Sequence, residues 1–360
     1  MRHEQVARRR CPKPHSVLIL AIETSCDETA AAIARGPTDR GAEVLSSVVA
    51  SQDALHAPFG GIVPEIASRR HLETITPVIA EAMSRAVVGW DDLEGIAVTN
   101  GPGLIGSLVV GVSVAKAVAE SRSLPIAGIH HLEGHIYGAA VGQALPFPAL
   151  ALIASGGHSH LVIMRDHGRY EVIGRTRDDA AGEAFEKGAR LLGLPYPGSP
   201  HLADLADSYR GRVRPMPRAR IPNSWDFSFS GVKTELARRV RQASPTDEER
   251  VMLAAAYQES IDLSLAERAT RAAEEFGGLP IVLVGGVARN RRLREMMAEK
   301  AAALGLSVRV PDPQLCTDNA AMIAAAGLYK LTIAGPDGPS LDVAANLPLR
   351  DWRPIAGAAW

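Results

Sequence analysis

Short apolar runs that end in small polar turns recur along the chain. The run VLILAIE begins at Val17, a polar turn follows at residues 24–29, and a second stretch of small apolar residues comes next. The same order returns at residues 149–165, where ALALIA leads into the turn SGGHS and then into HLVIM. Continuous apolar runs bounded by turn residues are typical of buried strands. The pattern therefore predicts one strand-turn-strand motif that is used twice.

Longer helical stretches follow each copy of this motif. We predict helices at residues 64–86, 106–120, 180–192 and 248–275. Strands that alternate with helices indicate an α/β fold with sheets flanked by helices. In a chain of 360 residues, two domains that face a cleft are expected in place of one very large core. Proline-containing segments between the halves place the hinge at residues 125–148.

Composition changes this picture mainly at the N-terminus, where residues 1–16 are basic, lack apolar periodicity and are predicted to be a disordered extension.

The apolar run from Val17 meets Glu23 too soon for a signal peptide, and no stretch reaches the roughly 18–20 apolar residues of a membrane helix. The three cysteines lack CxxC spacing, which argues against a disulfide framework or a cysteine-based zinc site. A net charge of -1 excludes a basic protein that coats nucleic acid nonspecifically. We expect a soluble, cytoplasmic protein.

Three glycine turns follow predicted strands. Gly285 and Gly286 lie between the apolar run IVLV and a predicted amphipathic helix that Asn290 precedes. Residues 155–157 form a hairpin turn, and residues 101–103 form a third turn. Backbone amides at such turns can contact a phosphate or the face of a nucleoside. None of them is a P-loop or a dinucleotide fingerprint, and one alone is an ordinary tight turn, but the three together predict a nucleotide cleft.

The run HHLEGH is a more specific signal. His131 and His135 are four residues apart and share one face of a helix, as two metal ligands must, whereas His130 points elsewhere. Glu133 has the wrong offset for the general base of an HExxH zinc protease. Asp318, ahead of an apolar helix, is the expected third ligand, and two histidines with one carboxylate suit non-haem iron(II) or zinc. The alternatives are packing or capping histidines and an Asp318 that serves as a helix N-cap.

Charged runs are less specific. Glu183 and Lys187 are spaced as an i,i+4 ion pair, as expected on an ordinary helix surface. Arginines are dense at residues 210–220, 238–241 and 289–294. These runs either form a path for a polyanion or are solvated surface charge, and each run alone favours the second interpretation.

Nine segments occur in an order that resembles one known family: AIETSCDET, GGIVPEIASRRH, GPGLIGSLVVG, HHLEGH, SGGHSHL, DDAAGEAFEK, DFSFSGVKT, GGVARNRRLR and CTDNAAMIA. From about residue 17 to 350 the chain is similar to the TsaD family, the tRNA N6-adenosine threonylcarbamoyltransferases formerly described as glycoproteases. The resemblance implies a two-domain α/β fold of the actin, sugar-kinase and Hsp70 type (ASKHA), with mixed sheets flanked by helices and an interdomain nucleotide cleft. It assigns residues 17–128 and about 318–350 to domain I, and residues 129–317 to domain II.

The resemblance also implies a reaction and a site. Members of this family transfer a threonylcarbamoyl group from threonylcarbamoyl-AMP to N6 of the adenosine at position 37, 3′ to the anticodon, in tRNAs that read ANN codons, and AMP is released. On the matching motifs, the implied metal ligands are His131, His135 and Asp318. The implied metal is one iron(II) per subunit, with zinc as the other possibility. The implied site for the intermediate comprises Ile153, Ala154, Ser155, Gly156, Gly157, Glu186, Ser199 and Asn290. No motif identifies a general base.

The partners implied by the resemblance are tRNA, threonylcarbamoyl-AMP, the shorter paralogue TsaB and the ATPase TsaE, and no membrane. We expect the helix at residues 64–86 to contact the paralogue. Two residues depart from the family pattern: Glu186 replaces the usual Asp, and Ser199 replaces a second glycine in YPGSP. Glutamate reaches one methylene further and serine adds a side chain, so binding of the nucleoside sugar is expected to be adjusted.

Three other functions fit parts of the sequence. A small-molecule kinase of the same fold needs an ATP site but not the histidine pair. A metallopeptidase, suggested by the former family name, needs the HExxH glutamate that the run lacks. A non-catalytic scaffold does not require a complete ligand set.

Overall fold

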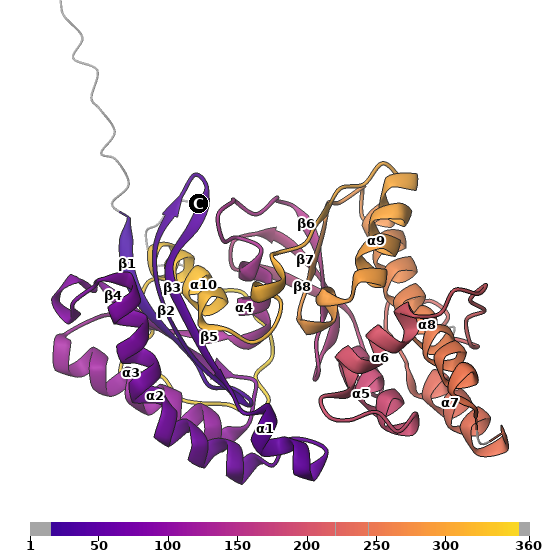
Figure 1. Cartoon of the computed structure of the whole chain (residues 1–360). Helices are drawn as coiled ribbons and strands as arrows, with labels where there is room; N and C mark the ends of the chain where they lie inside the picture. The colour runs from indigo at the N-terminus through magenta and orange to yellow at the C-terminus, as the bar shows by residue number, and fades with distance from the viewer. Residues whose placement is uncertain (1–15, 220, 244, 353–360) are drawn as a thin grey trace, which may run out of the picture.

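The computed structural model describes residues 16–219, 221–243 and 245–352, and these form two lobes that are each built on a five-stranded sheet (Figure 1). Of the basic extension predicted at residues 1–16, all but Ser16 lie outside the described residues. Between the two sheets, α4 and α10 fill the centre of the molecule (Figure 1).

The first sheet has the strand order β3-β2-β1-β4-β5. Its strands are β1 (Val17–Glu23), β2 (Glu28–Thr38), β3 (Gly41–Ser51), β4 (Gly95–Gly101) and β5 (Ile126–His130). The pairs β1-β2 and β2-β3 are antiparallel, whereas β1, β4 and β5 run parallel to one another. Because the carboxyl ends of parallel strands meet at one edge of a sheet, Glu23, Gly101 and His130 lie along the same edge.

The second sheet repeats this arrangement in the order β10-β9-β6-β7-β8. Its strands are β6 (Ala149–Ala154), β7 (Ser159–Asp166), β8 (Arg169–Arg175), β9 (Ile281–Val284) and β10 (Val308–Arg309). The strands β6, β7 and β8 form an antiparallel meander, and β9 and β10 run parallel to β6. The strand-turn-strand repeat predicted from the sequence is therefore confirmed, and the repeat extends to the whole sheet.

Helices cover both sheets and separate them (Figure 1). The helices are α1 (Asp53–His56), α2 (Pro64–Ala86), α3 (Ile105–Arg122), α4 (His131–Gly138), α5 (Ala181–Leu191), α6 (Gly198–Asp207), α7 (Ser230–Ala243), α8 (Asp247–Glu275), α9 (Arg291–Ala303) and α10 (Ala320–Ile333). Apolar residues of α2 and α3 pack on the outer face of the first sheet, and those of α5 to α9 pack on the outer face of the second. The inner faces of both sheets pack against α4 and α10. This alternation of inward and outward apolar residues is why the strands read as continuous apolar runs.

All four predicted helices are confirmed, and the segment predicted as a hinge contains regular structure. The helix at residues 64–86 is α2, and the ends of the other three differ from α3, α5 and α8 by at most two residues. Residues 125–148, predicted as a hinge, include β5 and α4. The five residues of β5 follow a proline and are all buried, and so short an apolar run does not reveal a strand by periodicity. Among the described residues, no helix has the length and apolarity that a bilayer span requires.

Candidate metal centre and the cleft beside it

Two histidines of the run HHLEGH lie on one face of α4, directly after β5. His130 caps this helix, since its Nδ1 accepts a hydrogen bond of 3.1 Å from Leu132 N–H. His131 and His135 follow one turn apart, and their exposed fractions are only 7% and 1%. The carboxyl end of β5 thus places two buried imidazoles at the edge where β1 also ends.

Asp318 completes a three-residue cluster. Its Oδ1 lies 3.5 Å from His131 Nε2 and 3.4 Å from His135 Nε2. The three ligand atoms all lie within 4.8 Å of one another. The alternative role of Asp318 as an N-cap is not realised, because Asn319 caps α10 by accepting a hydrogen bond of 2.9 Å from Met322 N–H. The Asp318 carboxylate is therefore directed at the imidazoles and not at the helix end.

Residues at the end of β1 orient the His131 ring. His131 Nδ1 lies 3.1 Å from Ser25 Oγ and 3.3 Å from Glu23 Oε2, which leaves Nε2 facing Asp318. Glu23 is almost fully buried and also accepts a hydrogen bond of 2.6 Å from the Thr99 hydroxyl. Metal-ligating histidines almost always use their second ring nitrogen in this way, on a carboxylate or a similar partner. The arrangement therefore matches the outer shell of a metal site.

The charges of the cluster fit a cation at its centre. Burial opposes ionisation of Asp318, but the neighbouring His131 and His135 outweigh it and hold the pKa of Asp318 well below its usual range. Burial also opposes protonation of His131, yet Asp318 and Glu23 raise its pKa to about 9. For His135, burial dominates and lowers the pKa, so this ring is neutral near pH 7. Two carboxylates thus face a pair of imidazoles of which only one is protonated.

The side chain of His135 gives the clearest evidence that the cluster fits a cation. Neither of its ring nitrogens forms a hydrogen bond with any described residue, although the side chain is 1% exposed. Nε2 has only the contact of 3.4 Å with Asp318 Oδ1, and Nδ1 has no partner among the described residues. Buried polar groups are normally hydrogen-bonded, so this arrangement needs an explanation. Ligand atoms that share one metal ion at about 2.0–2.2 Å are themselves about 3–3.5 Å apart. The two histidine-to-aspartate distances of 3.5 and 3.4 Å match that spacing, and the donor set of two imidazoles and one carboxylate fits a divalent metal.

The other two polar residues of the run face away from the cluster. His130 Nε2 donates a hydrogen bond of 2.8 Å to the Leu347 carbonyl, which confirms that His130 points elsewhere. The Glu133 carboxylate accepts a hydrogen bond from the Tyr170 hydroxyl on the opposite side of α4. Burial is the main reason that the pKa of Glu133 is raised to about 7. Glu133 is therefore not placed to act as a base beside the histidine pair.

Two of the predicted glycine turns lie side by side at the carboxyl ends of β6 and β9, which are parallel neighbours. Gly285 has a φ of +91°, and a Cβ at this position would lie 2.4 Å from the Ala154 carbonyl oxygen, so only glycine fits. By contrast, a Cβ at Gly156, Gly157 or Gly286 would meet no atom within 4 Å. The backbone of these three glycines is therefore bare and faces open space.

The remaining predicted site residues lie on α5, α6 and α9 of the second lobe. Both carboxylate oxygens of Glu186 accept hydrogen bonds from Gly198 N–H, at 2.8 and 2.9 Å, and Oε2 also accepts from Ser199 N–H and its hydroxyl. Glu186 thus caps the first turn of α6. Asn290 caps α9 through Leu293 N–H and donates a hydrogen bond of 3.0 Å from Nδ2 to Gln258 Oε1.

Sequence reasoning missed three polar residues of the site. Glu23 and Ser25 hold the His131 ring. His158 lies close to the cluster: burial, and then the charge of His131, lower its pKa to about 3. The available signal was the polar run ETSCDE at the end of an apolar strand, because strand ends of a parallel sheet meet at one edge. For His158 the signal was its place in the turn SGGHS.

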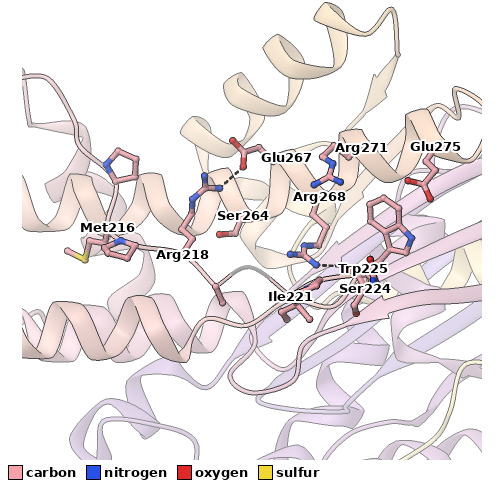
Figure 2. Close-up of a pocket in the computed structure, with 15 residues that line it drawn as sticks. Met216, Arg218, Ile221, Ser224, Trp225, Ser264, Glu267, Arg268, Arg271 and Glu275 are labelled. Carbon is pink, nitrogen blue, oxygen red and sulfur yellow. Dashed lines mark hydrogen bonds and ion pairs between the residues drawn. The ribbon is translucent and has the colours of Figure 1, made fainter.

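The arginine runs supply no residue of the cluster, although Arg294 of the run at residues 289–294 comes near it, with Nη2 3.5 Å from Cys316 Sγ. Arg218, of the run at residues 210–220, lines a cavity of about 1130 Å³ between α8 and the segment before α7. Figure 2 shows its ion pair with Glu267 and the hydrogen bond from Arg268 to Ser224. This cavity shares no residue with the histidine cluster or the glycine turns. Arg220 lies outside the described residues.

The duplicated sheet with helices between and around its copies is the fold of the actin, sugar-kinase and Hsp70 type. Full-length HypF in its phosphate- and nucleotide-bound form has a TM-score of 0.59 at 13% identity, over 90% of this chain and 47% of HypF. HypF from T. kodakarensis has a TM-score of 0.55 at 14% identity, over 87% of this chain and 48% of that one. Likeness at this identity shows the fold alone. Fold and site together define a two-lobed ASKHA-type protein with a candidate metal centre.

Sequence comparison narrows this class to one family. The family model described as TsaD, tRNA N6-adenosine threonylcarbamoyltransferase, matches residues 43–325. Proteins of that name from Symbiobacterium thermophilum and Geobacillus thermodenitrificans are 51% identical over 314 residues and 49% identical over 335 residues. The alignments cover 87% and 92% of this chain and 91% and 95% of the relatives. The chain belongs to the tRNA N6-adenosine threonylcarbamoyltransferase family, a family of acyltransferases, and the resemblance seen in its motifs is confirmed.

Proposed function

We propose that the chain transfers a threonylcarbamoyl group from threonylcarbamoyl-AMP to N6 of the adenosine 3′ to the anticodon in tRNAs that read ANN codons. N6 attacks the carbamoyl carbon, the bond from that carbon to the phosphate oxygen breaks, N6 loses a proton, and AMP leaves. Beyond family membership, one observation supports this proposal most directly. The buried cluster with the two unpartnered nitrogens of His135 adjoins the lobe in which bare glycine turns face open space.

The glycine turn after β6 is suited to the donor's phosphate. Ser155 N–H donates to the His158 carbonyl within the turn, so its amide is not available to a ligand. The amides of Gly156 and Gly157 form no hydrogen bond with a described residue. Fixed donors of this kind stabilise charge that develops on a leaving group without reorganisation. At the end of β6, Ile153 pairs with Val284 of β9 and Ala154 pairs with Ser159 of β7, which holds the turn in place.

The nucleoside of the donor is proposed to lie against Glu186, Ser199 and Asn290. The structure favours an indirect role for Glu186, because its carboxylate positions the first turn of α6, including Ser199. Asn290 is fixed in a similar way by its bonds to Leu293 and Gln258. These caps make the walls of the proposed nucleoside site rigid.

His131, His135 and Asp318 are proposed to hold one iron(II) per subunit, with zinc as the alternative. A bound metal of this kind acts as a Lewis acid that makes an acyl carbon more electrophilic. Glu23 and Ser25 keep the His131 ring in the required orientation, and burial of both rings excludes water. An aromatic amino group is a weak nucleophile, so activation on the acyl side is what this reaction needs.

The competing functions have less support from the site. A metallopeptidase needs a base beside its metal, but Glu133 is on the far side of α4, bonded to Tyr170. A small-molecule kinase of this fold does not account for a buried cluster of two histidines and a carboxylate.

We further propose that the chain acts in the cytoplasm with the TsaB paralogue and the TsaE ATPase. The outer face of α2 and α3 supports a protein partner, because three large apolar residues are exposed there. They are Leu72, 65% exposed, Ile105, 51%, and Val109, 46%. Large apolar side chains that are exposed together commonly mark a protein interface. Leu72→Glu is expected to abolish copurification of the paralogue without lowering the melting temperature of the chain.

The test of the function is the content of threonylcarbamoyladenosine in tRNA, measured by mass spectrometry of nucleosides after reconstitution. His135→Ala and Asp318→Ala are each expected to abolish the product while the protein stays folded. His130→Asn is the matched control in the same run, because asparagine keeps the helix cap and His130 faces Leu347. Wild-type product levels in either ligand variant would refute the proposal, and anomalous scattering at the iron and zinc edges would identify the metal.

A further inference from the structure

A cationic groove lies between α5 and α7, on the same lobe as the glycine turns. Its volume is about 730 Å³. The cations in its walls are Lys187, Arg190, Lys233, Arg238 and Arg241. Along α7, Lys233, Ala237 and Arg241 recur every four residues, so the groove follows one helix face for about 12 Å. The arginine run at residues 238–241 therefore lines a hollow and is not only flat surface charge.

The lysine end of this groove is preorganised. Asp179 pairs with Lys187 at 2.7 Å and also with Lys233, and Glu183 pairs with Lys187 at 2.8 Å. The i,i+4 pair predicted from the sequence is thus confirmed. These contacts hold two ammonium groups from different helices beside one carboxylate.

The arginine end carries the surplus positive charge. Arg238 pairs with Glu235 at 2.8 Å. Arg190 and Arg241 are exposed, and in the part of the chain that the structure describes neither has an ion-pair partner. Arg190 instead donates a hydrogen bond to the carbonyl of Gly60, in the first lobe. Two guanidinium groups thus remain available to an anion.

The groove lies along a helix that links the glycine turn to the first lobe. Lys187 directly follows Glu186 on α5, and α5 begins at the glycine turn, where Gly182 N–H donates to the Ser155 carbonyl at 3.1 Å. The bond from Arg190 to Gly60 joins α5 to the first lobe. A long polyanion with one residue at the glycine turn would therefore extend along α5 towards this groove.

The cavity in Figure 2 is less suited to a polyanion. There Arg218 pairs with Glu267 at 2.7 Å, and Arg268 donates a hydrogen bond of 2.7 Å to the Ser224 carbonyl. Arg271 lies over the Trp225 ring, 6.0 Å from its centroid. Its arginines are thus engaged within the protein, and no residue of α5 or of the glycine turns lines it.

We propose that the groove between α5 and α7 binds the sugar-phosphate backbone of the tRNA substrate, on the stem that leads to the reacting adenosine. The inference rests on the proposed function. Phosphate contacts by lysine and arginine position a nucleic acid and make its affinity depend on salt. Arg190 and Arg241 each contact one phosphate, and the paired lysines contact the next.

The test compares two double variants of the full chain, assembled with the partners that its activity requires. Arg190→Gln/Arg241→Gln removes the two groove cations that have no ion-pair partner among the described residues, and Arg218→Gln/Arg271→Gln removes two cations at the cavity of Figure 2. Binding of unmodified tRNA is measured between about 50 and 200 mM salt. For duplex DNA, each phosphate contact contributes about −0.9 to the slope of log affinity against log salt concentration. On this value, the loss of two contacts makes the slope less negative by about 1.8. The affinity deficit of the groove variant is then about twelvefold larger at the low-salt end than at the high-salt end.

Several outcomes separate this proposal from the function on which it rests. The groove variant is expected to raise KM for tRNA and keep kcat at saturating tRNA, whereas the control variant matches the wild type in both. If the wild type makes no threonylcarbamoyladenosine, the proposed function fails. If the wild type is active and the groove variant keeps its tRNA affinity and salt slope, the groove proposal alone is refuted. Loss of complex assembly with unchanged tRNA affinity would instead assign the groove to an acidic protein, which also refutes it.

Discussion

Replacement of His135 by leucine is expected to stabilise the metal-free protein and to destabilise the metal-loaded one relative to the wild type. In the metal-free chain, both ring nitrogens of His135 are buried without a hydrogen-bond partner. A buried unsatisfied polar group costs about 1–3 kcal/mol, and leucine removes that cost at similar volume. The metal-free variant should therefore be more stable than the wild type by about 1–2 kcal/mol.

Bound metal is expected to reverse the order of stability of the wild type and His135→Leu. A ligand that binds only the folded state at 100 times its Kd stabilises by about 2.7 kcal/mol, and the variant, with two of three ligands, should gain little of this. In a folding unit of about 150–250 residues, 1 kcal/mol shifts Tm by about 2–4 °C. The wild type should thus melt about 2–8 °C below the variant after chelation and about 1–7 °C above it with saturating iron(II) or zinc.

The control is His130→Leu, in the same run. Both ring nitrogens of His130 are hydrogen-bonded, to Leu132 and Leu347, so this variant should lose about 1–2 kcal/mol with or without metal. Thermal melts of the three proteins after chelation and after metal addition decide the question. If His135→Leu is as destabilised as His130→Leu in the metal-free state, or if metal shifts Tm of wild type and His135→Leu equally, the reasoning fails.

Three further predictions follow from single contacts. Gly285→Ala should cost about 1–3 kcal/mol in denaturant unfolding, because its Cβ would lie 2.4 Å from Ala154 O, whereas Gly286→Ala should stay within about 0.5 kcal/mol of the wild type. Asp262 is fully buried with both oxygens unpartnered, and burial raises its pKa well above the ordinary value. The folded state therefore binds the Asp262 proton more tightly than the unfolded state, so stability falls as pH rises from about 4 towards the folded pKa. Asp262→Asn should remove this dependence of stability on pH. Equal dependence of Tm on pH in the wild type and the variant, in thermal melts from pH 4 to 8, would contradict the prediction. Glu186→Asp should lower stability by about 1 kcal/mol through weaker capping of α6, and unchanged stability would show that the shorter carboxylate still reaches Gly198.

Sequence patterns predicted the helices and the repeat because both rest on local periodicity. They failed at β5, whose five buried residues follow a proline, and at β3, which was not predicted. A strand as short as β5 is specified by its parallel neighbour β4 and not by its own pattern. The length of α2, in contrast, allowed its ends to be placed to the residue.

The candidate metal site was found from residue type and spacing, but its outer shell was not. His131 and His135 are four residues apart in one helix, so their proximity is visible in the sequence. Glu23 lies 108 residues before His131, and only the parallel order of β1, β4 and β5 brings the two together. Likewise, the choice between ligand and N-cap for Asp318 depended on whether Asn319 caps α10, which the sequence leaves open.

The two sheets carry different chemistry at the carboxyl edge of their parallel strands. In the first sheet, β1 ends at Glu23 and β5 leads into His131. In the second sheet, β6 and β9 lead into turns with bare glycines, at Gly156 and Gly286. One duplicated edge thus supplies side-chain ligands and the other supplies backbone amides. The chain returns from the second lobe to the first just before α10, and Asp318 lies at that crossing, so the residue that completes the cluster sits where the two lobes are joined.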